Sequence, residues 1–180
     1  MDFLLQRIQG AIISATKGMS AKQLQWHPES KWSGAEILEH LLLTYSGTRI
    51  ACERCLQAEK PVAAVPSFKE RLSKIVVVKL VYMPKGRQAP RGTLPKGASP
   101  ENILATIQQQ IQNMDEAISK CEERFGSGAS LIKHPFLGPL TGAEWRKFHW
   151  VHARHHLRQI EHLKNKMPHN LSRRCVQTFV

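Results

Sequence analysis

The chain has 180 residues, 42% of them hydrophobic, which favours one globular domain with a sizeable core. Its formal net charge of +12 would suit a nucleic acid, but no aromatic RNA-binding motif or basic recognition helix accompanies it, so we expect a solvated basic surface and no nucleic-acid partner. No apolar run approaches the roughly 20 residues of a membrane span, and no basic segment precedes an apolar one at the start, so we expect a cytoplasmic protein without a membrane partner.

The first third of the chain predicts two amphipathic helices, separated by a connection over residues 26–33. Apolar residues recur at helical spacing between residues 2 and 17, and Gly18 fits as the stop of this helix. Ser33-Gly-Ala-Glu36 has the form of a capping box, in which each side chain accepts a hydrogen bond from the other residue's amide. It predicts the start of a second helix, which we expect to run to about Ala58.

The segment 66–82 has the features of a short helix and of a strand. Pro66-Ser-Phe-Lys-Glu70 is typical of a helix start, whereas Ile75-Val-Val-Val78 is rich in β-branched residues. We favour the helix because apolar residues continue at spacings of three and four. Residues 83–97 hold three prolines and three glycines and predict a long loop.

The second half of the chain predicts two further long helices. Ser99-Pro100-Glu101 combines a capping residue with proline at the first helical position, and apolar residues follow in alternating steps of three and four until Gly126. Residues 131–140 are expected to form a compact apolar loop. Thr141-Gly-Ala-Glu144 is another capping box, and it opens a histidine-rich helix that Pro168 ends.

These elements predict an all-α protein of the four-helix-bundle type over residues 1–167. An extra short helix lies in the crossover between the second and third long helices. No convincing strand pair and no internal repeat accompany the helices. We expect residues 168–180 to form a flexible basic tail.

Two histidines of the last helix stand four residues apart in an otherwise apolar stripe. His152 and His156 lie within about 40° of one face, because each residue turns a helix by about 100°. Trp145 and Ile160 recur on the same side, so the pair should face the interior, where an imidazole without a partner costs free energy. A histidine pair at this spacing is half of a metal site.

His40, on the second helix, is the best third ligand. Facing helices of a bundle commonly build metal sites in this way. For His40 alone, an amphipathic residue at a helix boundary is the commoner interpretation, but three converging histidines favour a divalent metal. His149 shares the face of the pair and is a candidate catalytic group for proton transfer, whereas His155 should point away.

Other polar residues have competing interpretations. Glu36 and Glu39 precede His40 and would suit a base or a group that orients it, but solvated glutamates are commoner at a helix start. Cys52-Glu-Arg-Cys55 has the spacing of a redox or zinc motif. It sits within a predicted helix and lacks a second cysteine pair, so we predict that these cysteines only pack.

The chain resembles the DinB/YfiT-like superfamily of small helical bundles over roughly residues 1–167. The resemblance rests on Trp32-Ser-Gly-Ala-Glu-Ile-Leu-Glu-His40, His134-Pro-Phe-Leu-Gly138 and His152-Ala-Arg-His-His-Leu-Arg-Gln159. It implies a four-helix bundle, often dimeric, that binds nickel, zinc or iron through His40, His152 and His156. Some branches of the superfamily resemble thiol S-transferases or isomerases that use bacillithiol, mycothiol or glutathione, and members are often described as metal-dependent hydrolases.

The motifs and the resemblance together predict a metal-dependent enzyme with a small-molecule substrate. Three histidines leave a bound metal with open positions, where the pKa of a thiol or a water falls. We expect transfer of a low-molecular-weight thiol to an electrophile; metal-dependent hydrolysis and a non-catalytic metal-binding stress protein are the alternatives. Lys85, Arg87 and Arg91 would contact carboxylates of an anionic thiol if their loop folds over the metal.

Overall fold

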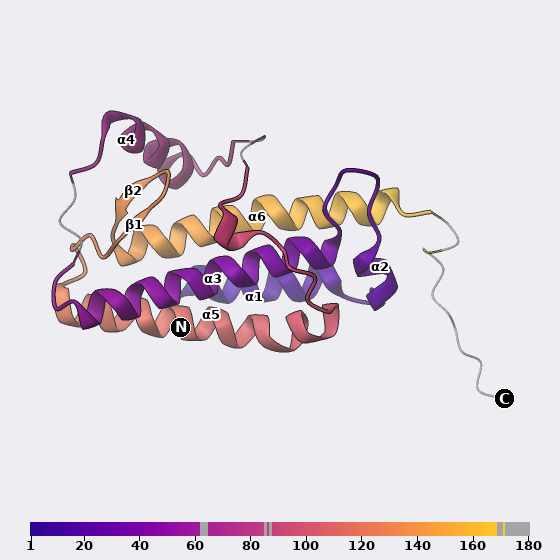
Figure 1. Cartoon of the computed structure of the whole chain (residues 1–180), viewed down its shortest axis with the longest axis horizontal. Coiled ribbons are helices and arrows are strands. Elements are labelled where there is room, and N and C mark those ends of the chain that lie inside the picture. Colours follow the sequence, from indigo (N-terminus) through magenta and orange to yellow (C-terminus); the bar gives the residue numbers. More distant parts are fainter. Residues whose placement is uncertain (62–64, 85, 87, 169–170, 172–180) are drawn as a thin grey trace.

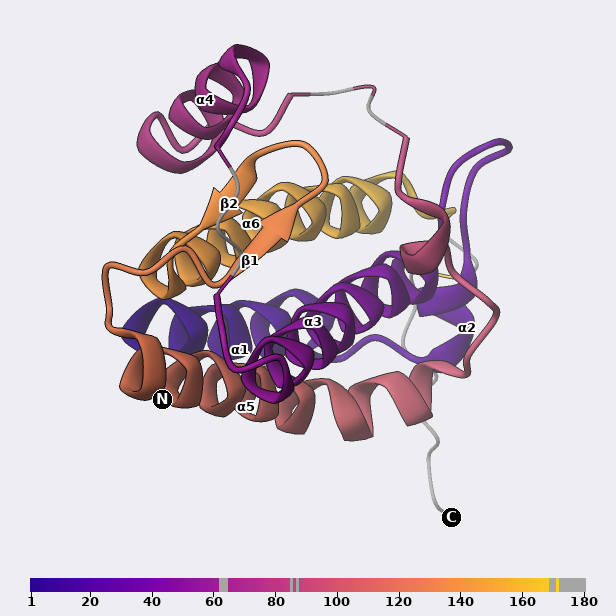
Figure 2. The ribbon, with the colours of Figure 1, turned by 60° about the vertical axis from the view of Figure 1, so that its left-hand side comes forward.

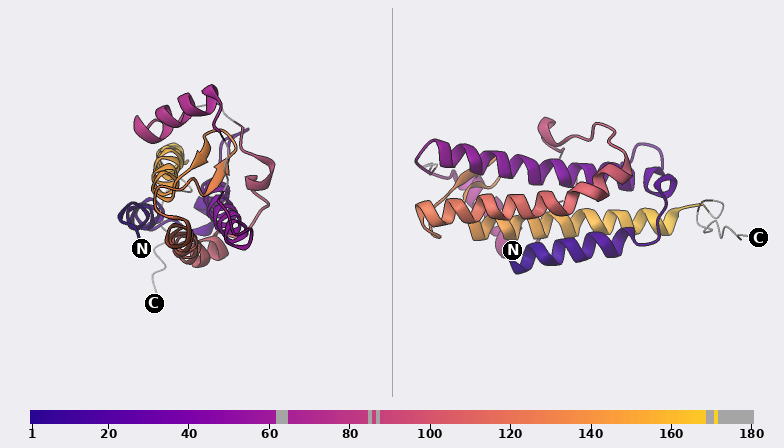
Figure 3. Two further views of the ribbon diagram at one scale, coloured as in Figure 1. Left: turned by 90° about the vertical axis from the view of Figure 1, so that its left-hand side faces the viewer. Right: turned by 90° about the horizontal axis from the view of Figure 1, so that it is seen from below.

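Four long helices lie side by side and enclose one apolar core (Figure 1; Figure 3). The computed structural model describes residues 1–61, 65–84, 86, 88–168 and 171, so most of the predicted tail lies outside the described residues. The long helices are α1 (Phe3–Thr16), α3 (Gly34–Gln57), α5 (Pro100–Phe125) and α6 (Gly142–Lys166). The mostly helical fold is thus confirmed. No helix within the described ranges is both long and apolar enough to cross a bilayer.

Three of the long helices begin where their capping residues predict. Ser33 with Glu36 at α3, and Thr141 with Glu144 at α6, form reciprocal capping boxes. Ser99 caps α5 through the amide three residues later. These caps satisfy backbone amides that helix geometry leaves without a partner, and they fix where each helix begins to present its side chains.

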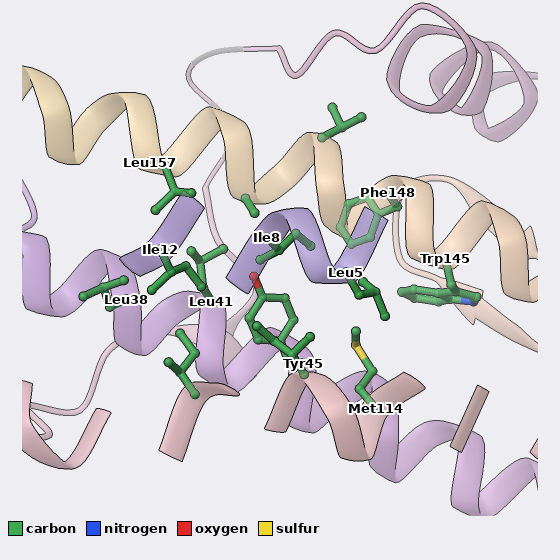
Figure 4. Packing of buried hydrophobic residues seen from close by; sticks show 14 of the residues in the cluster. Leu5, Ile8, Ile12, Leu38, Leu41, Tyr45, Met114, Trp145, Phe148 and Leu157 are labelled. Carbon is green, nitrogen blue, oxygen red and sulfur yellow. The ribbon is translucent and has the colours of Figure 1, made fainter. Parts of the chain in front are cut away.

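The core is built from apolar side chains of all four long helices (Figure 4). Ile8 of α1, Tyr45 of α3 and Met114 of α5 have no exposed surface. Burying one large apolar side chain stabilises a fold by about 1.5–3 kcal/mol. The predicted seam of α5 is confirmed, because its residues Ile107 and Ile118 are buried at the centre of this core.

Residues 68–79 are helical, so the strand alternative for the segment 66–82 is wrong. α4 (Phe68–Lys74) begins at a capping box of Ser67 and Glu70 and continues into a π-helical turn, η1 (Ile75–Lys79). The β-branched run stays helical because the cap starts the helix and Val77 and Val78 then reach the core. α4 itself lies outside the four long helices, over the hairpin and one end of α6 (Figure 2).

The predicted apolar loop is instead an antiparallel hairpin of β1 (Ile132–His134) and β2 (Gly138–Leu140). The turn is held by His134, whose Nδ1 accepts the amides of Phe136 at 3.1 Å and Leu137 at 3.2 Å. Gly138 follows with φ of +74°, a left-handed conformation that side chains disfavour. A side-chain acceptor and a glycine thus convert the expected loop into a hairpin.

A second short element, α2 (Ala21–Gln25), precedes the predicted connection. Its signal is present in the sequence, because Ser20 and Gln23 form a capping box. The five-residue helix is too short to show apolar periodicity, so the spacing of apolar residues does not predict it.

A buried guanidinium joins α6 to α5. Arg146 is 8% exposed; its Nε donates to Asp115 Oδ1 at 2.7 Å, and its Nη1 donates to Glu122 Oε2 at 2.7 Å. Its Nη2 donates to Ser119 Oγ at 2.9 Å. Separating the partners would leave the charge of Arg146 or of a carboxylate buried without compensation, which costs free energy. The network therefore fixes the position of α6 against α5.

Gly142, at the start of α6, lies against the Glu122 carboxylate, where a methyl group would overlap it. We expect Gly142→Ala to displace Glu122 from Arg146 and to lower the free energy of unfolding by about 1–3 kcal/mol. Gly10→Ala is the matched control, because nothing lies within 4 Å of its added methyl group and alanine favours a helix by about 0.5–1 kcal/mol. Urea unfolding measures the free energy of unfolding of the two variants. If both variants were more stable than the original chain, the expectation would be contradicted.

Candidate metal centre

Three imidazoles meet where α3 faces the middle of α6. His40 comes from α3, and His152 and His156 come from successive turns of α6. The Nε2 atom of His152 lies 3.2 Å from Nε2 of His40 and 3.0 Å from Nε2 of His156. One nitrogen from each ring lies within 4.8 Å of the other two. The structure therefore brings together the three histidines that the sequence analysis selected.

Aromatic side chains hold two of these rings in place. Phe148 stacks on His152 with ring centres 5.3 Å apart and planes 13° apart. Trp32, in the connection before α3, lies 5.2 Å from the ring centre of His40. His40 is only 4% exposed and His152 9%, so neither ring can turn away into solvent. The site is thus shaped before anything binds.

The outer nitrogens define the protonation of two rings. Nδ1 of His40 lies 2.8 Å from the carbonyl oxygen of Thr93, which can only accept, so this nitrogen carries the proton. Nδ1 of His156 lies 2.8 Å from Gln159 Oε1 in the same way. A neutral imidazole has one proton, so Nε2 of both rings is left as a lone pair directed at the centre.

All three rings favour the neutral form. Burial lowers the pKa of His40 despite its hydrogen bond to Thr93, and burial with the neighbouring histidines lowers the pKa of His156 to about 3. Burial, together with the charges that His156 and His40 would carry, holds the pKa of His152 well below its usual range. Neutral imidazole is the form that binds metals, so the centre is ready to bind at neutral pH.

The donor set fits a divalent cation. Zn–N bonds of about 2.0–2.1 Å with tetrahedral angles place ligand nitrogens about 3.3 Å apart, and right angles place them about 2.9 Å apart. The separations of His152 from His40 and His156, 3.2 and 3.0 Å, lie within that range, and the third separation, between His40 and His156, is within 4.8 Å. Nδ1 of His152 is buried and has no hydrogen-bond partner among the described residues. The His152 proton therefore remains on Nε2, shared with a neighbour, unless a cation displaces it to Nδ1.

Among the described residues, no fourth side chain completes the cluster. In the part of the chain that the structure describes, the metal-competent group at this point consists of these three histidines and includes no carboxylate or thiol. Glu36 is bound in the cap of α3, as expected for a helix start. Glu39 is buried and accepts the amides of Gly97 at 3.0 Å and Ala98 at 3.1 Å. A three-ligand set leaves coordination positions open to exchangeable ligands.

The long loop passes over His40. It contains a 3-10 turn, η2 (Arg91–Thr93), and the carbonyl of Thr93 is the partner of His40 described above. Arg91 is exposed on this turn, two residues from that contact. Lys85 and Arg87, the other expected anion contacts, lie outside the described residues.

Histidines outside the trio have other surroundings. His149 has no exposed surface, and its Nε2 lies 3.1 Å from Thr48 Oγ1, one turn deeper in the core than His152. His155 lies 3.2 Å, Nε2 to Nε2, from Gln159, the residue that also holds His156. The catalytic role of His149 therefore stays a prediction. Because this side chain has no exposed surface, it can exchange a proton only with other buried groups.

The cysteines of α3 pack in the core, as predicted. Cys52 and Cys55 are buried and free, and Cys121 of α5 joins them, with Sγ 3.4 Å from the carbonyl oxygen of Cys52. Burial raises the pKa of all three thiols, to about 11 for Cys121. Thiols in this state are poor nucleophiles.

Sequence reasoning missed the residues that orient the ligands. Gln159 stands three residues after His156 on the same helix face, so helical spacing was a usable signal for it. Thr93 acts through its backbone carbonyl, which no side-chain pattern reveals. Trp32 lies in the connection before α3, and its contact with His40 adds an apolar wall to the centre.

The fold and the site define a class: a mostly helical protein with a candidate three-histidine metal centre between two long helices. The chain belongs to the DUF1569 family, described as proteins of unknown function, whose model matches residues 7–163. The match includes all three histidines of the centre. Neither a curated protein nor a solved structure matches the chain.

Acid should destabilise the fold through buried histidines such as His134. Burial lowers its pKa to about 4 in the folded protein, against 6.5 for an ordinary histidine. Between these two pH values the unfolded chain binds more protons at this position than the folded chain. The contribution of His134 to stability is therefore fully present above pH 6.5 and is lost as the pH falls towards 4. The loss is at most about 3 kcal/mol. His134→Asn keeps an acceptor for the turn but does not titrate.

Urea unfolding of metal-free protein at pH 7 and pH 4.5 tests this expectation. The stability of His134→Asn should fall less with acid than that of the original chain. His162→Asn, an exposed position on α6, is the matched control. Equal acid sensitivity of His134→Asn and the original chain would show that His134 is not responsible.

Metal content should depend on the trio alone. Protein purified without an affinity tag should hold a divalent metal near one per chain, and His156→Ala should lose it because only two ligands remain. His162→Ala, exposed on the same helix, should keep the metal, and His155→Ala should keep it too. Elemental analysis of folded variants measures this; full metal in His156→Ala would reject the assignment.

Proposed function

We propose that this chain is a DinB/YfiT-like four-helix bundle that transfers a small thiol to an electrophilic substrate at a divalent metal, nickel, zinc or iron. The observation that carries the proposal is the convergence of three neutral Nε2 atoms without a fourth protein ligand among the described residues. A cation held there would lower the pKa of a coordinated thiol and so supply a thiolate at neutral pH.

The surroundings of the trio favour thiol transfer over hydrolysis. Metal-dependent hydrolysis commonly uses a carboxylate as general base beside the metal. Here Glu36 is engaged in a helix cap and Glu39 in the amides of the loop. Thiol transfer needs no such base, because a thiol gives up its proton far more readily than water does.

The chain's own residues have separate tasks in this proposal. His40, His152 and His156 bind the cation, while Thr93 and Gln159 keep the protons of two rings on Nδ1. Phe148 and Trp32 exclude water from the sides of the His152 and His40 rings. Removal of hydrogen-bonding partners such as Thr93 and Gln159 commonly changes metal affinity by 10- to 100-fold.

The substrate thiol is proposed to be anionic. Arg91 is exposed on the turn that contacts His40, where its guanidinium is suited to a carboxylate of the thiol. Lys85 and Arg87 have the same proposed role from the sequence. A homodimer is part of the proposal only through the resemblance to the superfamily.

Two alternatives follow from the same trio. A hydrolase would use water in place of the thiol, and a non-catalytic stress protein would keep the metal for structure alone. The open coordination positions favour a catalytic or exchangeable site over a structural one, because structural zinc is normally closed by a fourth protein ligand.

Cobalt substitution distinguishes these functions. Glutathione, bacillithiol or mycothiol should add a sulfur-to-cobalt charge-transfer band to the cobalt protein, and the band should be absent in His40→Ala and present in His162→Ala. If no thiol gives the band while esters or amides are hydrolysed, hydrolysis replaces transfer. If neither occurs and the metal resists a chelator, the site is structural.

A further inference from the structure

α4 turns its apolar side outward. Phe68 is 81% exposed, Leu72 53% and Ile75 43%, and they form one stripe because they stand four and three residues apart. Val65, just before the helix, is 86% exposed, and Leu80 and Tyr82 extend the exposed apolar surface beyond η1. A surface helix normally buries this stripe and exposes its polar side. We call the stripe of Phe68, Leu72 and Ile75 the α4 face.

The polar side of α4 is fixed against the rest of the protein. Glu70 pairs with Lys133 of β1 at 3.0 Å, and Lys74 pairs with Glu144 of α6 at 3.1 Å. Gly138 of β2 lies so close to Glu70 that an added methyl group would be 3.1 Å from its Cβ. These contacts determine the rotation of α4 about its axis, so the outward direction of the α4 face is built into the fold.

Basic residues border the α4 face on both sides. At about 100° per residue, Lys69 and Arg71 flank the stripe, and both are exposed. Lys79, at the end of η1, is exposed as well. Glu70 is the only acidic residue between Phe68 and Lys79, and it points inward to Lys133. The outward surface is therefore apolar at its centre and cationic at its rim.

We propose that the α4 face docks on the surface of an anionic lipid bilayer. Phe68, Leu72 and Ile75 would enter the boundary between headgroups and acyl chains, where helices of this kind bind. Lys69 and Arg71 would reach the lipid phosphates while their aliphatic stems stay in the apolar layer. A second copy of the chain fits less well, because it would bring one cationic rim against another.

The proposed attachment is peripheral, so it requires no membrane-spanning helix, and none lies among the described residues. It is independent of the metal centre, since none of the proposed ligands lies on α4 or η1. The binding is expected to weaken at high salt, because part of it comes from charge at the bilayer surface.

Co-sedimentation with vesicles tests the proposal. The full chain should sediment with vesicles of phosphatidylcholine and phosphatidylglycerol and stay in solution with phosphatidylcholine alone. Phe68→Ser/Leu72→Ser should lower the affinity for the anionic vesicles about tenfold or more. Phe3→Ser/Ile13→Ser, at equally exposed apolar positions of α1, should bind like the original chain.

A second pair of variants separates local from overall charge. Lys69→Glu/Arg71→Glu should abolish binding, whereas Lys17→Glu/Arg158→Glu, which changes the net charge equally at exposed positions elsewhere, should bind nearly as well as the original. Equal loss in both pairs would overturn the proposal, as would no binding to anionic vesicles. Sedimentation velocity without lipid measures whether the chain forms dimers. If it does, and if Phe68→Ser/Leu72→Ser dissociates them, the α4 face is an interface between two copies of the chain and not a membrane-binding surface.

Discussion

The candidate centre depends on the convergence of three neutral imidazoles, two of which direct lone pairs at one point. Two lone pairs 3 Å apart repel each other, so a cation or a shared proton has to lie between them. The rest of the fold maintains this arrangement: Arg146 fixes α6 to α5, and the stacking of Phe148 on His152 holds that ring in place.

The loop and the centre are linked through α3. Consecutive residues of that helix hold the loop, because Glu39 accepts two of its amides and His40 donates to the carbonyl of Thr93. The same hydrogen bond that orders the loop therefore sets which nitrogen of His40 faces the cation. A shift of this part of the loop would change the metal site, although the described residues of the loop supply no ligand.

Much of the fold was predictable because its signals are local. Capping boxes at Ser33 and Thr141 fixed two helix starts, and the four-residue spacing of His152 and His156 placed both on the inner face of α6. His40 was predictable because it lies on the apolar side of a facing helix. What could not be predicted depends on the backbone or on long-range contacts: the carbonyl of Thr93, and the hairpin that His134 closes with two amides.

The orientation of α4 is another feature that the sequence alone could not predict. Periodicity identifies an apolar stripe, but the stripe alone does not say whether it faces the core, and sequence reasoning assumes that it does. Here the core contact is supplied one element later, by Val77 and Val78 of η1, so α4 needs little burial of its own. The ion pairs on its inner side are partly exposed and each contributes at most about 1 kcal/mol. Because η1 secures the segment, α4 keeps an outward apolar surface that nothing in the described chain covers.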